Sequence, residues 1–398
     1  MQDDSKEHAR QPRLIFQINM QIIFAITLIA VMGVASITPA FPKIRDALGL
    51  TNQQVGSLIT VFTLPGIFLN PVLGVLADRY GRKTIIVPSL FIFAVAGTAC
   101  AFAEEFNTLL ILRFFQGVGA ASIGSINVAL IGDLWSGRQR ATAMGTNASV
   151  LSIGTASYPA IGGALAMLGW HYPFFLSVLA LPAGVWVLFS LKNPESRSSE
   201  TMIRYLKGVL RYLKNGNVIV LFVISILTFV ILYGSYLTYL PLALDDRFGA
   251  LPYQIGLILS FGSVSTALTS PQLGRLSSRF SYKQLLIFAN GLYVVSMLLI
   301  PLLGSLWLNL IPAAIFGVAQ GINIPGIQTL LAGSAPMEYR AAFMSVNGMV
   351  LRLGQTLGPI VTGFAFTIAG MTATFVSGAA FAVIMAVMIV VLVKKFHV

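Results

Sequence analysis

The charged residues of this chain are few, and they gather in a small number of places. Only 10% of its 398 residues are Asp, Glu, Lys or Arg. The stretch GVLADRYGRKT, Gly74 to Thr84, nevertheless holds three cations and one anion directly after a long apolar run. Such a cluster can form ion pairs, and a carboxylate at one helix end can meet the positive N-terminal end of a neighbouring helix. The chemistry expected here is therefore electrostatic contact.

No pattern for catalysis or metal binding accompanies these charges. The sequence contains no phosphate-binding Walker sequence, no zinc-ligand spacing and no nucleophile with a plausible base. The only cysteine, Cys100, lies inside an apolar run, so it can form no intrachain disulfide and gives no support to a metal site. We therefore expect no enzyme activity, no catalytic residues, no metal and no cofactor.

Two arginines, Arg113 and Arg352, lie inside apolar runs. An arginine near the centre of a bilayer costs about 2.5 to 3.5 kcal/mol on insertion scales, so each is expected to face a cavity. At about 100° per residue, Arg113 and Asn127 share one helix face, whereas Arg352 faces away from Gly354 and Gly358. Polar residues also form stripes along the faces of other predicted helices. The alternative role for the residues of each stripe is interhelical hydrogen bonding. The candidates for substrate contact or coupling are Arg113, Asn127, Tyr233, Tyr236, Gln320, Asn323 and Arg352.

The acidic residues raise a doubt about proton coupling. All thirteen Asp and Glu residues fall outside the interiors of the apolar runs. Proton-coupled pumps usually place a titratable carboxylate within the membrane, where desolvation raises its pKa. If protons drive this protein, Asp245, Asp246 or Asp133, each at the end of an apolar run, must carry them. The alternative is that each is an ordinary solvated loop charge.

The elements that must position these residues are long apolar segments. The chain is 56% hydrophobic, and roughly 20 apolar residues suffice to cross the hydrocarbon of a bilayer. Twelve such runs predict an all-α integral membrane protein with twelve transmembrane helices. The expected spans are 15–38, 54–77, 84–103, 107–132, 141–166, 172–191, 217–243, 254–274, 285–303, 306–333, 341–367 and 370–393.

Positive charge sets the expected orientation. With the N-terminus in the cytoplasm, 20 of the 25 Lys and Arg residues lie on the cytoplasmic side and two lie within spans. The opposite side holds only Lys43, Arg45 and Arg247. This bias follows the positive-inside rule and places both termini in the cytoplasm. The net charge of +12 is thereby explained by topology, so no nucleic-acid partner is expected.

A constant offset of 200 residues aligns the two halves of the chain. NPVLGVLADRYGRKT, from Asn70, matches SPQLGRLSSRFSYKQ, from Ser270. The same offset pairs Asp46 with Asp246, Gly56 with Gly256, Gly154 with Gly354, Pro159 with Pro359 and Gly163 with Gly363. Both copies of the charged stretch lie on the cytoplasmic side, so each half holds an even number of spans. This predicts six-helix bundles over 1–191 and 217–398, joined by a cytoplasmic linker, 192–216, with a basic amphipathic helix.

These residues resemble the major facilitator superfamily, and more narrowly its twelve-span drug:proton antiporters, over essentially the whole chain. The loop motif after the second span is matched by Gly74, Leu76, Asp78, Arg79, Gly81, Arg82 and Lys83. The fourth-span motif is matched by Leu109, Arg113, Phe114, Gln116, Gly117 and Gly119. The fifth-span motif is matched by Gly145, Gly154, Pro159, Gly162 and Gly163, with Tyr158 in place of a family glycine.

The resemblance implies a conformational latch at the loop motif. Asp78 would meet the N-terminus of the eleventh span, near Ala341, and Arg82 would reach Asp133, holding the protein outward-open. The alternative is that Arg79, Arg82 and Lys83 act only as topogenic charges. In the second half Ser278, Ser281 and Tyr282 replace Asp78, Gly81 and Arg82, so this copy of the latch has been lost.

The fifth-span motif has a copy 200 residues on. It consists of Gly354, Gly358, Pro359 and Gly363. Small residues allow close helix packing, and proline is tolerated where neighbouring groups satisfy the freed carbonyl. These positions are therefore either packing sites or bending points at the interface between the halves.

The resemblance implies a secondary active transporter that exports drugs or small organic molecules by alternating access and proton-coupled antiport. The alternative is a specific carrier of an anionic or neutral metabolite held by Arg113 and Arg352, with coupling that does not use a membrane carboxylate. A receptor that retains the fold is a third possibility, but it would normally add a soluble output domain. The expected partners are a small-molecule substrate, the bilayer of the plasma or bacterial inner membrane and the proton gradient, and the expected state is a monomer.

Overall fold

The protein is all-helical in the computed structural model, which describes residues 14–191, 216–334 and 340–392. Side chains at 340–345 are not described. The expected linker helix and both chain ends lie outside these residues. The first half contains α1 (Ile18–Ala35), α2 (Phe41–Leu48), α3 (Asn52–Tyr80), α4 (Arg82–Ala99), α5 (Phe106–Leu134), α6 (Gly137–Leu168), the 3₁₀ segment η4 (Tyr172–Leu179) and α7 (Ala180–Ser190).

The second half follows a similar order, with two separate helices, α11 and α12, where the first half has the continuous α3, and with two further local differences. Its elements are α9 (Gly216–Val230), the π-helical segment η5 (Ile231–Tyr239), α10 (Leu240–Phe248), α11 (Pro252–Thr269), α12 (Leu273–Ser277), α13 (Tyr282–Leu302), α14 (Leu310–Ser334) and α15 (Arg340–Leu392). The first difference is that η5 inserts a π-helix between α9 and α10, which no sequence pattern had predicted. The second is that α15 is broken at Ala369 and at Gly370, where a φ of 73° reverses the chain.

Ten helical segments among the described residues are long and apolar enough to cross a membrane. One of them, Val346–Val391, contains both arms of α15. The 18-residue helix α11 is not among the ten. The expectation of an all-α membrane fold is therefore confirmed. The break in α15 at Ala369 and Gly370 falls at the expected boundary between the spans 341–367 and 370–393.

The internal repeat is visible in the local structure of the two halves. Gly49 after α2 and Gly249 after α10 both adopt the left-handed conformation, with φ of 61° and 60°. Each is followed by a helix whose third residue, Gln54 or Gln254, accepts a hydrogen bond from the backbone N–H three positions earlier. Helices α2 and α10 therefore end in the same way at positions 200 residues apart.

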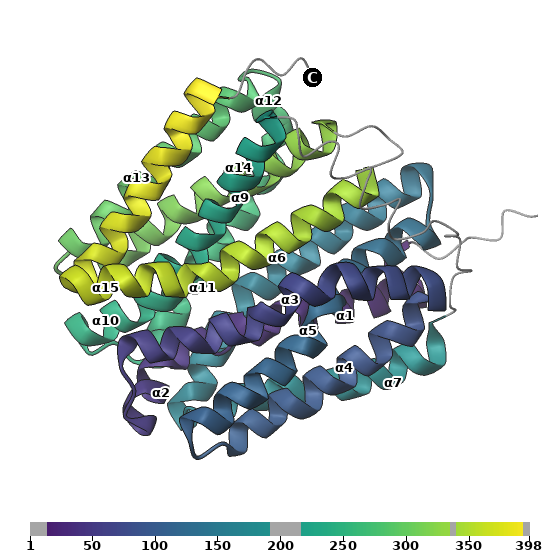
Figure 1. Cartoon of the computed structure of the whole chain (residues 1–398), viewed down its shortest axis with the longest axis horizontal. Helices are drawn as coiled ribbons and strands as arrows, with labels where there is room; N and C mark the ends of the chain where they lie inside the picture. The colour runs from purple at the N-terminus through teal and green to yellow at the C-terminus, as the bar shows by residue number, and fades with distance from the viewer. Residues whose placement is uncertain (1–13, 192–215, 335–339, 393–398) are drawn as a thin grey trace, which may run out of the picture.

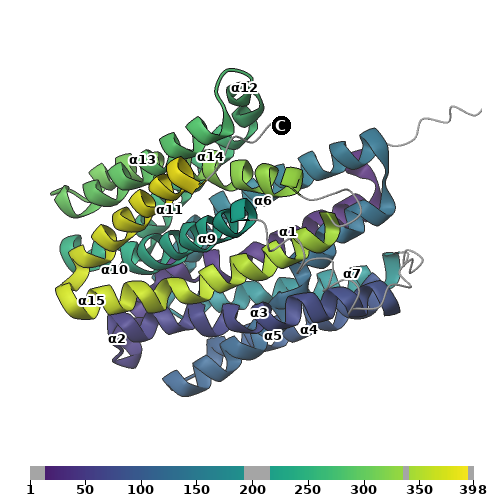
Figure 2. The ribbon, with the colours of Figure 1, turned by 45° about the horizontal axis from the view of Figure 1, so that its top comes forward.

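The two halves lie side by side and meet along two helix pairs. In Figure 1 helices α3, α4, α5 and α7 of the first half lie below α15, and helices α9, α13 and α14 of the second half lie above it. Helix α3 packs along α15, and α6 packs along α11, so each pair joins one half to the other. In both views α15 runs alongside α3 (Figures 1 and 2). We call the end of the molecule that carries α2 and α10 the α2 end.

Candidate functional site

The α6/α11 pair is held by direct backbone contact. A Cβ added at Gly256 would lie less than 3.0 Å from the carbonyl oxygen of Pro159, and one added at Gly163 would lie equally close to the carbonyl oxygen of Pro252. The Ala160 N–H donates to Ser260 Oγ at 3.1 Å. Glycine is required at both positions because no side chain fits between the two backbones.

The α3/α15 pair uses the repeat-related residues with side chains between the helices. A Cβ at Gly56 would lie 3.1 Å from Pro359 Cβ, and one at Gly363 would lie 3.2 Å from Gln53 Cγ. Thr63 Oγ1 shares a hydrogen bond of 2.8 Å with Thr356 Oγ1 across the pair. This contact, which we call the polar seam, therefore joins the halves through side chains.

The remaining glycines of the two motifs contact helices of their own half. Gly154 and Gly162 face α1, Gly354 faces α9 and Gly358 faces the junction of α9 and η5, whereas Gly145 has no atom within 4 Å of its Cβ position. Neither Pro159 nor Pro359 interrupts its helix. The interface role expected for the motifs thus falls to Pro159, Gly163, Pro359 and Gly363.

Arg113 is sealed inside the first half and faces no open cavity. Its side chain is 0% exposed. It donates to the carbonyl oxygens of Gly33 and Leu58 at 3.0 and 3.3 Å and to Gln116 Oε1 at 2.6 Å. The guanidinium also lies 4.2 Å from the centre of the Phe62 ring. Backbone carbonyls and an aromatic face thus replace a counter-ion.

Asn127 points to α1, as Arg113 does, which confirms the expected shared face. Asn127 Nδ2 donates to Thr27 Oγ1 at 2.6 Å, and Thr27 Oγ1 donates to Asn147 Oδ1 at 2.5 Å. In the second half Asn323 Nδ2 donates to Thr228 Oγ1 at 2.8 Å. Asn127 and Asn323 therefore form hydrogen bonds between helices, which is the alternative to substrate contact.

Two other members of the stripes differ in their surroundings. Tyr236 stacks on Phe316 with ring centres 4.0 Å apart, and its buried hydroxyl has no hydrogen-bond partner among the described residues. Gln320 is partly buried on α14.

Arg352 lies in the polar seam. A Cβ at Gly66 of α3 would lie 3.0 Å from Arg352 Cδ, so the arginine of the second half rests on a helix of the first. Arg352 Nη1 donates to Gln355 Oε1 at 3.0 Å. Gly354 and Gly358 face α9 and η5 instead, which confirms that Arg352 and these glycines point in different directions.

The loop motif forms a charged cluster at the end of the molecule opposite α2. Arg82 Nε lies 3.0 Å from Asp133 Oδ2, which confirms the expected contact, and Arg82 also pairs with Asp78. Gly81 has a φ of 92° and separates α3 from α4. The contact expected between Asp78 and the helix start near Ala341 falls on side chains that are not described, so it stays a prediction.

The other motif residues lie around this cluster. The Arg79 guanidinium lies 5.5 Å from the centre of the Tyr80 ring. Lys83 follows Arg82 in the first turn of α4. No atom lies within 4 Å of the Cβ position of Gly74.

A second charged cluster, at the α2 end, joins the halves and was missed at the sequence level. Arg45 of α2 pairs with Asp245 and Asp246 of α10 at 2.8 and 2.6 Å and with its neighbour Asp46 at 2.9 Å. Asn52 donates to Asp246 at 3.2 Å. Asp245 and Asp246 are thus ion-paired, and the signal for Arg45 was its position 200 residues before Asp245.

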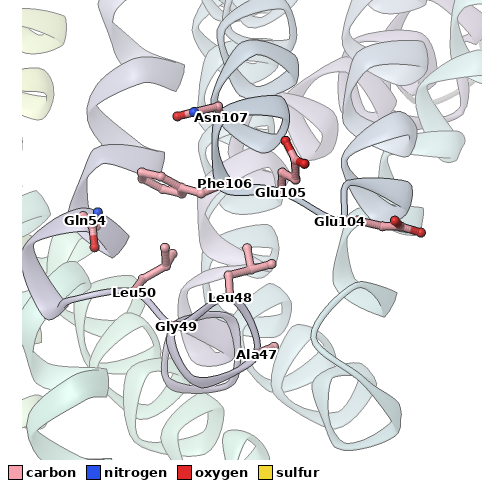
Figure 3. Close-up of a pocket in the computed structure, with 9 residues that line it drawn as sticks. All are labelled: Ala47, Leu48, Gly49, Leu50, Gln54, Glu104, Glu105, Phe106 and Asn107. Carbon is pink, nitrogen blue, oxygen red and sulfur yellow. The ribbon is translucent and has the colours of Figure 1, made fainter.

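A hollow of about 610 Å³ lies beside α2, between the turn into α3 and the start of α5. Figure 3 shows Leu48, Leu50 and Phe106 around this space, with Glu104 and Asn107 at its edges. All of its lining residues belong to the first half, so it does not lie between the halves. Among the described residues, no group of three or more His, Cys, Asp or Glu side chains could hold a metal ion.

Comparison with known proteins finds relatives of this chain among bacterial drug-resistance proteins and exporters. The chain is 27% identical over 354 residues to multidrug resistance protein 1 of Bacillus subtilis, covering 88% of this chain and 90% of that one. It is 26% identical over 370 residues to the quinolone resistance protein NorA of Staphylococcus aureus, with coverage of 92% and 94%. It is 25% identical over 370 residues to the bacillibactin exporter of Bacillus subtilis, with coverage of 86% and 88%.

Solved structures share the fold at low sequence identity. The nucleoside transporter NupG superposes with a TM-score of 0.77 at 15% identity, over 95% of this chain and 99% of that one. A bacterial homologue of the human lysosomal transporter Spinster, inward-facing and occupied, also gives 0.77, at 18% identity, over 95% and 96%. The family model for the Major Facilitator Superfamily matches residues 23–252 and 243–396. The chain therefore belongs to the Major Facilitator Superfamily, a family of secondary transporters and not of enzymes.

Proposed function

We propose that this protein exports drugs or other small organic molecules by alternating access, as a proton-coupled antiporter of the cell membrane. The observation that carries the proposal is the pair of repeat-related contacts, α6/α11 and α3/α15, along which the halves meet. Parallel repeats that rock against each other about a midplane site are the general plan of such transporters. The printed names of the bacterial relatives support efflux as the direction.

The proposal includes the topology expected from the sequence. Twelve spans follow if the two arms of α15 each cross and α11 crosses with its short continuation, in addition to the other nine segments. The bundles are then 1–191 and 217–398, both termini are cytoplasmic and the α2 end faces outward. A reporter fused after Val398 should be active in the cytoplasm. A reporter active only on the outer side would contradict this orientation.

The inner cluster of Asp78, Arg82 and Asp133 is proposed to act as the latch of the outward-open state. Arg82 already holds both carboxylates in one half, so Asp78 needs only a neighbouring helix end to join the second half. Asp78→Asn should leave the protein inserted but impair transport. Glu104→Gln, which changes a carboxylate in the outer hollow, is the matched control. Normal turnover in Asp78→Asn would reject the latch.

The decisive experiment is proton flux in proteoliposomes of the purified, monomeric protein. Lipophilic cations, neutral drugs and organic anions are added in turn while the internal pH is followed. Flux that depends on an added compound would support antiport. Movement of radiolabelled compound without proton flux would reject proton coupling, and the absence of any movement would reject the proposed function.

A further inference from the structure

The guanidinium of Arg352 has far fewer partners than that of Arg113. An arginine carries five N–H donors. Within the part of the chain that the structure describes, the only hydrogen bond from the Arg352 side chain goes to Gln355, and none of the ion pairs involves Arg352. Arg113, in contrast, uses two carbonyl oxygens, an amide and an aromatic ring. Arg352 is therefore a cation within the membrane without a counter-ion in the described chain.

The unused donors of Arg352 are not sealed in the protein. The buried nitrogen and oxygen atoms that lack a partner include Arg113 Nη2 but no atom of Arg352. Its unpaired N–H groups therefore keep some accessible surface. The Gly66 contact places the side chain beside α3, because it holds the aliphatic part of Arg352 against that helix.

Tyr233 supplies a second polar group beside the helix of Arg352. A Cβ at Gly358, six residues after Arg352 in α15, would lie 3.3 Å from the Tyr233 carbonyl carbon, so Tyr233 packs on the helix that carries Arg352. Its ring stacks on Phe229 with centres 6.0 Å apart, which holds the side chain in place. The Tyr233 hydroxyl makes no hydrogen bond and is likewise absent from the sealed atoms. A cation and a hydroxyl without a hydrogen-bond partner among the described residues thus lie on packed neighbouring helices, α15 and η5.

We propose that Arg352 and Tyr233 bind the anionic group of the transported molecule, so that the substrates include organic carboxylates. A guanidinium binds a carboxylate through two parallel N–H bonds, and the Tyr233 hydroxyl can donate a third. Gln355 orients the guanidinium from within α15. An unpaired charge in the membrane is costly, so a bound anion supplies the missing counter-charge. This inference rests on the proposed transport function, and it names the substrate class.

The test compares three probes of one shape: 2-naphthoate, 2-naphthamide and 2-naphthylmethylammonium. Binding to the detergent-solubilised protein is followed by the ligand-induced rise in unfolding temperature, and transport is followed in proteoliposomes. The wild type should bind naphthoate at least about tenfold more tightly than the other two, as expected for one charged hydrogen-bonded pair. A preference for the ammonium or the amide would overturn the site.

Three variants assign the preference to the proposed residues. Arg352→Gln should abolish the preference for naphthoate over naphthamide, because it removes the charge that distinguishes the two probes. Arg352→Lys should retain part of it, because the charge remains and the planar fork is lost. Tyr233→Phe should weaken naphthoate binding severalfold. Naphthoate preference that survives in Arg352→Gln would overturn the proposal, and competition by phosphatidylglycerol would assign the site to a lipid headgroup and overturn it as well.

The two readouts separate this inference from the proposed function. If naphthoate binds in an Arg352-dependent way but none of the probes is transported, the anion site stands and the transport proposal fails for these compounds. If naphthoate is transported equally by the wild type and Arg352→Gln, transport stands and the site fails.

The cluster at the α2 end carries a second, independent inference. Because α2 and α10 are repeat-related, Arg45 and Asp245 occupy equivalent positions of the two halves and meet at 2.8 Å. Identical charges at such a contact would repel. The repeat keeps Asp46 and Asp246 identical but places opposite charges at 45 and 245, which makes this contact attractive. We infer that the Arg45 cluster is an ionic lock that holds the α2 end closed.

Accessibility of a cysteine buried in the polar seam tests the lock. Thr63, which is 0% exposed, is replaced by cysteine in a Cys100→Ser background and labelled with a membrane-impermeant maleimide from the α2 end. Arg45→Asp, which places four carboxylates together, should accelerate labelling about tenfold or more. The double variant Arg45→Asp/Asp245→Arg should return the rate to near that of the parent.

Arg247→Gln is the matched control for the lock. Arg247 lies at the same end but donates to the carbonyl oxygens of Ile300 and Leu303, within the second half. Its replacement should leave labelling unchanged. Unaltered labelling in Arg45→Asp, or a charge swap that fails to restore the parent rate, would overturn the ionic lock.

Discussion

The two long helix pairs that join the halves, α6/α11 and α3/α15, share a framework of glycine and proline but differ in how the helices touch. At α6/α11 the Gly256 and Gly163 positions approach backbone carbonyl oxygens so closely that no Cβ fits. At α3/α15 the equivalent Gly56 and Gly363 positions lie at least 3.1 Å from side-chain atoms. At α6/α11 backbone packs on backbone, and at α3/α15 side chains lie between the two backbones.

The difference indicates a division of labour between related interfaces. Where backbone packs on backbone, no side chain can change its conformation to let the helices shift. The α6/α11 contact is therefore suited to act as a rigid pivot. The polar seam contains threonines, a glutamine and Arg352, whose hydrogen bonds can be exchanged for bonds to water or to a ligand. Matched substitutions at repeat-related positions can therefore test whether the two contacts really differ.

The largest effect is expected from Gly256→Ala compared with Gly56→Ala. At Gly256 the new methyl group meets the Pro159 backbone, which can move only with α6, so overpacking should cost about 1–3 kcal/mol of stability. At Gly56 the methyl group meets Pro359 Cβ and Thr238 Cγ2 at 3.1 and 3.2 Å. There a helix-propensity gain of about 0.5–1 kcal/mol should offset most of the strain. Unfolding temperatures in detergent measure both, and equal losses would remove the distinction between pivot and seam.

The repeat made these contacts predictable in outline. The 200-residue offset had already paired Gly56 with Gly256 and Pro159 with Pro359, and the structure places each glycine against the proline of the other half. The resemblance likewise predicted the Arg82–Asp133 contact. Such features could be predicted because identical residues at repeated positions are visible without coordinates.

Other features of the site were not predictable for identifiable reasons. Arg45 was counted only as an outer-loop cation. The alignment of the two halves rests on identical residues, and position 45 is Arg where position 245 is Asp, so the alignment did not single out this pair. Helical arithmetic placed Arg113 and Asn127 on one face, but it could not show that carbonyl oxygens of α1 and α3 would seal the guanidinium. The π-helix η5 has no periodic signature of its own, since its residues fit an apolar span equally well.

A somewhat smaller contrast is expected between Gly163→Ala and Gly363→Ala. The Gly163 methyl group would meet the Pro252 carbonyl, whereas the Gly363 methyl group would meet Gln53 Cγ and the Tyr239 hydroxyl, each at 3.2 Å. Gln53 can rotate away, so only Gly163→Ala should lose stability, by about 1–2 kcal/mol. Transport rates of both variants at a temperature below unfolding provide a second readout. A slower Gly363→Ala with an unaffected Gly163→Ala would reverse the assignment.

Within the polar seam, Thr63→Val tests the bond that crosses between the halves. Valine keeps the shape but removes the 2.8 Å hydrogen bond to Thr356, and it leaves Thr356 Oγ1 with its intrahelical bond to the Arg352 carbonyl oxygen. The expected loss is about 1 kcal/mol in the closed state. Thr362→Val, whose hydroxyl bonds only within α15, is the control and should not alter seam accessibility. An equally large loss of stability in Thr362→Val would show that the hydrogen bond between Thr63 and Thr356 contributes no more than a bond within one helix.

The smallest effect is expected at the exposed edge of the seam, where Thr367 Oγ1 lies 3.4 Å from Gln53 Oε1. Water competes for both groups there, and exposed substitutions away from special features usually change stability by no more than about 0.5 kcal/mol. Gln53→Ala should therefore leave unfolding unchanged, although it frees the space beside Gly363. This makes Gln53→Ala/Gly363→Ala a sharper test than either single change, because the added methyl group would then no longer meet Gln53 Cγ. Stability equal to the wild type in this double variant, together with a loss in Gly163→Ala, would show that the contacts differ through what lies opposite each glycine and not through the glycines themselves.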